Sequence, residues 1–206
     1  MFKLSDFDKS LVDKGNLVEE WARKLFPDGI LIDEAGEDTL QITKQHIAEK
    51  THVIFQPKFI YDKFLAKCDA LEYDKENNCW NLYEIKGTNT LDENVREIDH
   101  IEEATFQTII LKSAGIKVGK VFIVHLNREY VRKDEINIQE LFVKEGITEE
   151  VKDREETTKL KMQKVAEGLF QQDESALACQ CVYAGRSAHC ATFRYSYPHI
   201  PEYSVH

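Results

Sequence analysis

The sequence from residue 80 to residue 87 reads Trp-Asn-Leu-Tyr-Glu-Ile-Lys-Gly, an apolar run that ends in two charged residues. It predicts a short β-strand, and side chains alternate along a strand, so Trp80, Leu82, Glu84 and Lys86 share one face. A carboxylate and an ammonium group are costly to bury at the end of an apolar strand unless they serve a purpose. We therefore interpret this stretch as marking a divalent-metal site.

Further β-forming residues precede this strand. They concentrate in three runs, residues 52–56, 59–64 and 67–73. Residues 74–78, Asp-Lys-Glu-Asn-Asn, have the composition of a turn. Residues 79–86 are therefore expected to return antiparallel to 67–73 and to close a β-meander.

Helices are expected on both sides of this meander. Apolar residues recur at helical spacing in residues 16–26, 39–50 and 101–114. Asn16 is a good N-cap, and Glu19 three residues later gives a capping-box arrangement. A buried strand is expected over residues 120–126. This order predicts an α+β, α/β-like core with a mixed central sheet flanked by helices.

A long charged helix is expected over residues 148–170. It suggests a division into a core, residues 1–147, and a C-terminal part, residues 148–206, made of this helix and a cysteine-bearing tail. The 206 residues, 42% of them hydrophobic, suffice for one sizeable core. The chain could also be one domain of a longer protein.

Composition narrows the possible partners. No apolar run approaches the roughly 18–20 residues that span a bilayer, and the N-terminus lacks the pattern of a signal peptide. We therefore expect a cytoplasmic protein with no membrane partner. The net charge of −10 argues against broad electrostatic binding of nucleic acid, although it leaves room for a local basic groove.

Asp69 is the natural companion of Glu84. A hairpin with its turn near residues 74–78 can bring the two carboxylates across from each other. They repel unless a cation lies between them, and Lys86 on the same face can stabilise a phosphate in its transition state. We expect Asp69, Glu84 and Lys86 to converge on one pocket that solvent reaches.

The pattern of Asp69, Glu84-Ile85-Lys86 and a following helix with Gln107 resembles the PD-(D/E)xK nuclease superfamily. The order helix, meander, helix, strand is similar to its RecB-like branch. Residues 14–29, 82–86 and 125–131 resemble an uncharacterised bacterial family of such domains with a cysteine-rich C-terminus.

This resemblance implies a restriction-endonuclease-like core and a role for each matching residue. Asp69 and Glu84 would bind metal, with the Ile85 carbonyl as a further ligand, and Lys86 would be the catalytic lysine. Gln107 would help to position the active site or the DNA, although the tyrosine that usually follows it is Leu111 here. Glu19, four residues after Gly15, would be another metal ligand.

Three of these residues also have an ordinary structural interpretation. Glu19 could complete the capping box with Asn16. Gln107 could be an exposed helical glutamine, and Lys86 could form a salt bridge with Glu72 or another acid of the hairpin.

The cysteines of the tail form a second candidate site. Three of the five cysteines, Cys179, Cys181 and Cys190, are clustered, and such thiols can bind zinc or an iron–sulfur cluster. A fourth ligand could come from His189, His199, Cys68 or Cys79. The alternative is three free thiols, and the odd number of cysteines argues against a disulfide framework.

The resulting hypothesis is an exonuclease-like deoxyribonuclease that depends on Mg²⁺ or Mn²⁺ and acts on DNA, or alternatively on RNA. One rival is a catalytically inactive nuclease-fold module that binds nucleic acid or a protein partner. A second rival, supported only by the tail, is a small zinc-binding interaction domain. The sequence does not indicate the oligomeric state.

Overall fold

The computed structural model describes residues 6–32, 38–88, 100–169 and 193–201. The chain divides into two units, residues 1–160 and 161–206. This boundary falls inside helix α5 (Thr148–Gly168), whereas the sequence suggested a boundary before that helix. The sheet and the candidate site both belong to the first unit.

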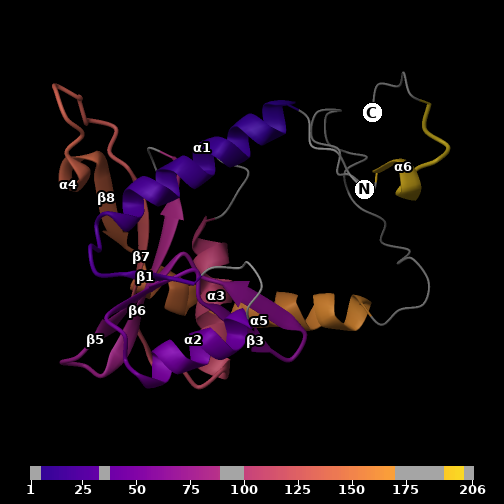
Figure 1. Cartoon of the computed structure of the whole chain (residues 1–206). Helices are drawn as coiled ribbons and strands as arrows, with labels where there is room; N and C mark the ends of the chain where they lie inside the picture. The colour runs from indigo at the N-terminus through magenta and orange to yellow at the C-terminus, as the bar shows by residue number, and fades with distance from the viewer. Residues whose placement is uncertain (1–5, 33–37, 89–99, 170–192, 202–206) are drawn as a thin grey trace. The chain divides into compact units, whose positions relative to one another are not determined.

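A mixed six-stranded sheet is the centre of the first unit (Figure 1). Its order is β1 (Ile30–Leu31), β2 (Val53–Phe55), β5 (Ala70–Asp74), β6 (Cys79–Lys86), β7 (Val118–Leu126) and β8 (Phe142–Gly146). The pairs β1–β2 and β6–β7 are parallel, and the other neighbours are antiparallel. The predicted α+β class with a mixed central sheet is confirmed, and so is the antiparallel pairing of β5 with β6.

Helices flank this sheet, as the sequence predicted. Besides α5, the first unit contains α1 (Asp6–Arg23), α2 (Thr39–Ala48), α3 (His100–Ser113) and α4 (Ile138–Leu141). The second unit contains α6 (Phe193–Ser196). Across the described ranges, none of these helices has the length and apolar character needed to cross a membrane.

One face of the sheet packs against the C-terminal half of α1. Ala22 of this helix and Phe26, three residues after its end, are buried in a core cluster with Tyr83 and Ile85 of β6. The rings of Phe26 and Tyr83 meet edge to face with centroids 4.9 Å apart, and Phe122 stacks on Tyr83 at the same distance. The odd-numbered side chains of β6 therefore belong to the α1 face.

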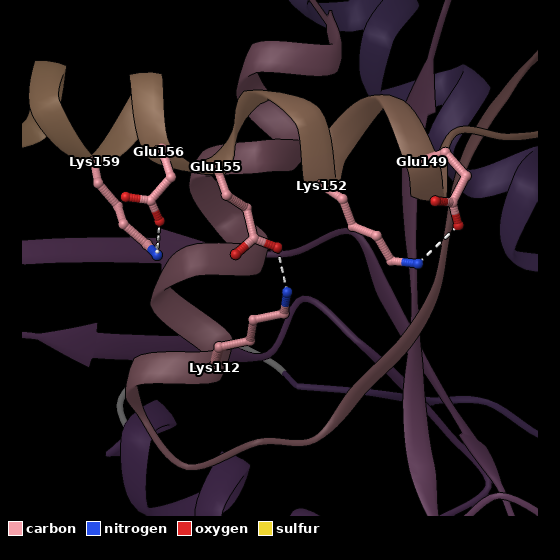
Figure 2. A network of polar contacts seen from close by, with 6 residues as sticks. All are labelled: Lys112, Glu149, Lys152, Glu155, Glu156 and Lys159. Atoms are coloured by element: carbon pink, nitrogen blue, oxygen red, sulfur yellow. Dashed lines mark hydrogen bonds and ion pairs between the residues drawn. The ribbon is translucent and has the colours of Figure 1, made fainter.

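The opposite face is covered by α3, with α5 packed against it. The Thr158 hydroxyl of α5 donates to the Glu102 carboxylate at 3.1 Å, and Lys112 of α3 pairs with Glu155 of α5. Figure 2 shows this pair beside two pairs within α5, Lys152 with Glu149 and Lys159 with Glu156. Because exposed ion pairs contribute at most about 1 kcal/mol, buried Val151 and Thr158 do more to hold α5 in place.

The first helix begins earlier than the sequence predicted. Residues 16–26 were expected to be helical, but α1 starts at Asp6 and runs through Gly15. One glycine costs a helix only about 1 kcal/mol, so Gly15 does not interrupt it. Asn16 is consequently not an N-cap, and the predicted capping box with Glu19 is wrong.

The run predicted as one strand over residues 59–64 contains most of β3, a two-residue turn and the start of β4. β3 (Lys58–Tyr61) and β4 (Phe64–Lys67) form a separate two-stranded sheet, in which Tyr61 pairs with Phe64. Asp62 takes a left-handed backbone with φ of 53°, a conformation that Asp tolerates better than most side chains. Helix α4 and strand β8 were not anticipated.

Gly119 provides a test of packing between β6 and β7. A Cβ atom at Gly119 would lie 2.5 Å from the sulfur of buried Cys79 and 2.8 Å from Asn81 Oδ1. We expect Gly119→Ala to lower the free energy of unfolding by about 1–3 kcal/mol, because overpacking forces the core to shift. Gly146→Ala is the matched control, since its Cβ would meet Phe122 at an ordinary 3.7 Å. Urea denaturation of both variants measures the difference, and equal stability would contradict this packing.

Candidate functional site

The site lies at the C-terminal end of the central strand β6. Every residue of β6 except Lys86 is buried, and Glu84 is only 2% exposed. Because side chains alternate along a strand, Glu84 and Lys86 point away from the α1 face and toward α3. An ionisable carboxyl group is thus enclosed within the apolar layer between the sheet and α3.

Both carboxylate oxygens of Glu84 have a partner. The Lys86 ammonium lies 2.6 Å from Glu84 Oε1, and the Gln107 side-chain amide donates to Oε2 at 2.7 Å. Gln107 is 4% exposed, so its interpretation as an exposed helical glutamine is wrong. Strand β6 and helix α3 together fix the orientation of this carboxyl group.

Glu103 is a site residue that the sequence analysis missed. Its carboxylate accepts a hydrogen bond from Lys86 at 2.6 Å, so the ammonium lies between Glu84 and Glu103. The alternative pairing of Lys86 with Glu72 is wrong, because Glu72 instead accepts from the Tyr83 hydroxyl on the other face. Helical spacing could have revealed Glu103, since it precedes Gln107 by four residues and shares its face.

Asp69 lies beside Glu84, as the hairpin register predicted. Ala70 is paired with Tyr83, so the residue before Ala70 is opposite Glu84. The Ile85 backbone N–H donates to Asp69 Oδ2 at 2.7 Å. Asp69 is thereby held at the edge of β6, next to the carboxyl group and the ammonium group of the same strand end.

The Ile85 carbonyl points to the same side of β6. The N–H and C=O of one strand residue lie on one side of the strand, and the Ile85 N–H is directed at Asp69. The alternate residue Thr88 confirms the pattern, because its carbonyl accepts from Leu126 N on the β7 side. The backbone oxygen of Ile85 therefore points to the side where Asp69 lies.

These neighbours change the ionisation of the carboxyl groups. Burial raises the pKa of Glu84 to about 8, and the negative charge of Asp69 adds to the effect. Burial also raises the pKa of Asp69 to about 6, despite the hydrogen bond from Ile85. Burial would lower the pKa of Lys86, but Glu84 and Glu103 outweigh it and raise that pKa above its usual range. The lysine is consequently held in its charged form.

Glu19 of α1 forms its hydrogen bonds with residues outside this group. Its carboxylate accepts hydrogen bonds from Arg23 at 2.9 Å and from the Gln56 side chain at 2.5 Å. Its charge still contributes to the raised pKa of Asp69. Gln56, missed by the sequence analysis, has a left-handed backbone with φ of 56° directly before Pro57. That conformation is uncommon for a glutamine, and no sequence signal announced it.

The donor set suits a hard divalent cation. Carboxylate and carbonyl oxygens are the ligands that Mg²⁺ and Mn²⁺ prefer, and Asp69, Glu84 and Ile85 supply them. Gln107 Oε1 is buried beside Glu84 without a hydrogen-bond partner, which is the kind of atom that an ion or its hydration shell satisfies. Among the described residues, however, no three Asp, Glu, His or Cys side chains are arranged to hold a metal ion. Two carboxylates and a backbone oxygen are the available set.

The other predicted ligands do not join this group. Cys179, Cys181 and Cys190 lie outside the described residues, so a zinc or iron–sulfur site there stays a prediction. Cys68 and Cys79 are buried free thiols in the first unit. Burial, with the charges of Glu84 and Asp69, raises the pKa of Cys68 and keeps this thiol neutral.

Comparison of the sequence with models of protein families and with curated proteins found no match. The superfamily resemblance therefore stays a prediction that rests on the named residues.

The raised pKa of Glu84 predicts how stability depends on pH in metal-free buffer. A carboxyl group whose pKa is about 8 when folded and 4.5 when exposed binds protons more tightly in the folded state. The stabilisation that this tighter proton binding gives the folded state is fully present below pH 4.5 and is lost as the pH rises toward 8. We expect the stability of Glu84→Gln, relative to wild type, to increase between pH 5 and pH 8 by at least about 1.4 kcal/mol, the equivalent of one pKa unit.

Urea denaturation at pH 5, 6.5 and 8 in EDTA measures this difference. Glu76→Gln, on the exposed turn between β5 and β6, is the control and should follow wild type. A difference between Glu84→Gln and wild type that stays constant with pH would contradict the raised pKa.

Proposed function

We propose that the chain is a metal-dependent nuclease that hydrolyses phosphodiester bonds in DNA, with a restriction-endonuclease-like core. The observation that carries this proposal is the grouping of Asp69, Glu84 and Lys86 at one end of the central strand. Two carboxylates and a lysine grouped at one strand end are the parts that this chemistry requires. The proposal includes an exonuclease-like mode and a cytoplasmic location.

Asp69 and Glu84, with the Ile85 carbonyl, would hold Mg²⁺ or Mn²⁺. When bound, such an ion supplies Lewis-acid stabilisation of the phosphate and activates water. Glu19 would be a further ligand, because Arg23 and Gln56 both donate to its Oε1 atom and its charge already acts on Asp69.

Lys86 would act through its positive charge. Its raised pKa keeps the ammonium protonated at neutral pH, so it suits stabilisation of the developing charge on a phosphate and not proton abstraction. Glu103 and Glu84 fix its position from two sides, and Gln107 fixes Glu84 in turn. The residues around the ammonium thus hold it in place before substrate arrives.

A catalytically inactive nuclease-fold module is the second candidate. It is favoured by one observation, which is that Glu84 is enclosed with both oxygens partnered by Lys86 and Gln107. In such a module the same ion pair would be purely structural. Metal binding and DNA cleavage distinguish the two candidates.

Metal binding gives the first test. We expect wild-type protein to bind Mn²⁺ in isothermal titration calorimetry and Asp69→Asn to bind it at least tenfold more weakly, because the neutral amide lacks the charge while it still accepts from Ile85. Asp62→Asn makes the same change at an exposed carboxylate on the β3–β4 turn and should bind as wild type does. Equal Mn²⁺ affinity in Asp69→Asn and wild type would exclude Asp69 as a ligand.

Cleavage of linear and circular DNA in Mn²⁺ gives the second test. We expect wild type to degrade the linear form and Lys86→Ala to be slower by about 100-fold, the usual effect of removing a group that stabilises developing charge. Lys112→Ala also removes a lysine paired with a glutamate (Figure 2) and should retain full activity. If the wild-type protein binds Mn²⁺ but cleaves neither linear nor circular DNA, the proposal of a nuclease is wrong and the inactive module is favoured.

A further inference from the structure

Gln56 connects two segments of the chain that both carry candidate metal ligands. Its backbone N–H donates to the Asp69 carbonyl at 3.0 Å, and its side-chain amide donates to Glu19 Oε1 on α1 at 2.5 Å. Glu19 and Gln56 are 37 residues apart in the sequence. A single residue therefore contacts the side chain of one candidate ligand and the backbone of another.

The backbone around Gln56 is fixed on both sides. Gln56 follows β2 directly, and the next residue, Pro57, has a φ that its ring restricts to a narrow range. The Cys68 N–H donates to the Pro57 carbonyl at 3.1 Å, beside the bond between Gln56 and Asp69. These two bonds fix the backbone of Gln56 relative to that of Asp69.

Gln56 also has a strained backbone. Its φ of 56° lies in the left-handed region, which a glutamine seldom adopts. Such strain persists only where surrounding contacts hold it, and it is concentrated at ligand-binding and catalytic sites. Asparagine or glycine would fit this backbone with less strain, but asparagine is one methylene group shorter and glycine has no side chain. The contact with Glu19 therefore requires the length and the amide group of glutamine.

The Glu19 carboxylate is held through one of its oxygens. Arg23, four residues later on the same helix, donates to Oε1 at 2.9 Å, and Gln56 donates to the same atom. Because both donors use Oε1, Oε2 is the oxygen that a cation would take. The Arg23 contact orients Glu19 relative to α1, whereas the Gln56 contact orients it relative to the segment that carries Asp69.

Glu19 and Asp69 are also coupled through their charges. Burial raises the pKa of Asp69 to about 6, and the negative charge of Glu19 adds to that effect. Two carboxylates that repel each other favour a cation between them. The Glu19 side chain is 17% exposed, so an ion can reach it from solvent.

We infer that Gln56 is a positioning residue, which aligns Glu19 with Asp69 so that both carboxylates bind one divalent cation, an inference that rests on the proposed function. Gln56 itself does not touch the ion and acts through Glu19. Residues that hydrogen-bond to metal ligands commonly act in this way, and their loss weakens metal binding by roughly 10–100-fold.

Calorimetric titration of the full chain with Mn²⁺ tests this role. We expect Gln56→Met to bind Mn²⁺ about tenfold more weakly than wild type or worse, because methionine matches glutamine in length but has no amide donor. Gln56→Asn keeps the amide and tolerates the left-handed backbone, but it is too short to reach Glu19 and should show the same loss. The matched control is Gln45→Met, which removes a glutamine that donates to Glu49 at 2.9 Å on the surface of α2. It should bind Mn²⁺ within about twofold of wild type.

A combination with Glu19→Gln separates positioning from a general effect on folding. Glu19→Gln removes the charge of the ligand and should weaken Mn²⁺ binding by about tenfold or more. Adding Gln56→Met to Glu19→Gln should change the affinity by less than about twofold, because Gln56 acts on the ion only through Glu19. Circular dichroism and urea denaturation in EDTA verify that each variant folds.

The inference is overturned if Gln56→Met and Gln56→Asn bind Mn²⁺ as wild type does, if Glu19→Gln does so, or if Gln56→Met weakens binding equally with and without Glu19→Gln. None of these outcomes affects the dependence of Mn²⁺ binding on Asp69, so the proposed function would stand. A wild-type protein that binds no Mn²⁺ overturns the proposed function and this inference together. Mn²⁺ binding that depends on Gln56 through Glu19, in a protein that cleaves no DNA, would support the positioning role and overturn the nuclease.

Discussion

The structure of the site depends on the burial of one carboxyl group, that of Glu84. A buried carboxylate is unfavourable unless charged or hydrogen-bonding groups surround it. Lys86 supplies the charge and Gln107 supplies the hydrogen bond, and Glu103 holds the ammonium from its other side. Removing Lys86 or Gln107 would leave one oxygen of Glu84 without its partner in the apolar layer, so these side chains form a single unit.

This unit is possible because the two neighbours of β6 in the sheet run in opposite directions. On one side β6 pairs antiparallel with β5, so a short turn suffices to bring Asp69 opposite Glu84. On the other side it pairs parallel with β7, and a parallel connection requires a crossover, which here contains α3. That crossover brings Glu103 and Gln107 over the end of β6. The hairpin therefore brings Asp69 to the end of β6 from nearby in the sequence, and the crossover brings Glu103 and Gln107 to it from farther away.

Strand alternation and hairpin register are properties of neighbouring residues, which is why the sequence predicted the shared face of Glu84 and Lys86, the position of Asp69 and the mixed sheet. Gln107 was found through a resemblance. Glu103 and Gln56 were missed because their roles depend on tertiary contacts and, for Gln56, on a left-handed backbone. The start of α1 and the β3–β4 turn were mispredicted because each depends on one residue, Gly15 or Asp62, whose preference for a particular backbone conformation is only moderate.

The edges of the sheet have a consequence for how the protein behaves when concentrated. An exposed edge strand offers unpaired backbone groups to another chain, and short or charged edges discourage such aggregation. In the described sheet, one edge is β1, which is only two residues long. The other is β8, whose exposed side chains include Lys144 and Glu145. Neither edge is a good template for a neighbouring strand, and this geometry favours colloidal stability in a chain that already carries an excess of negative charge.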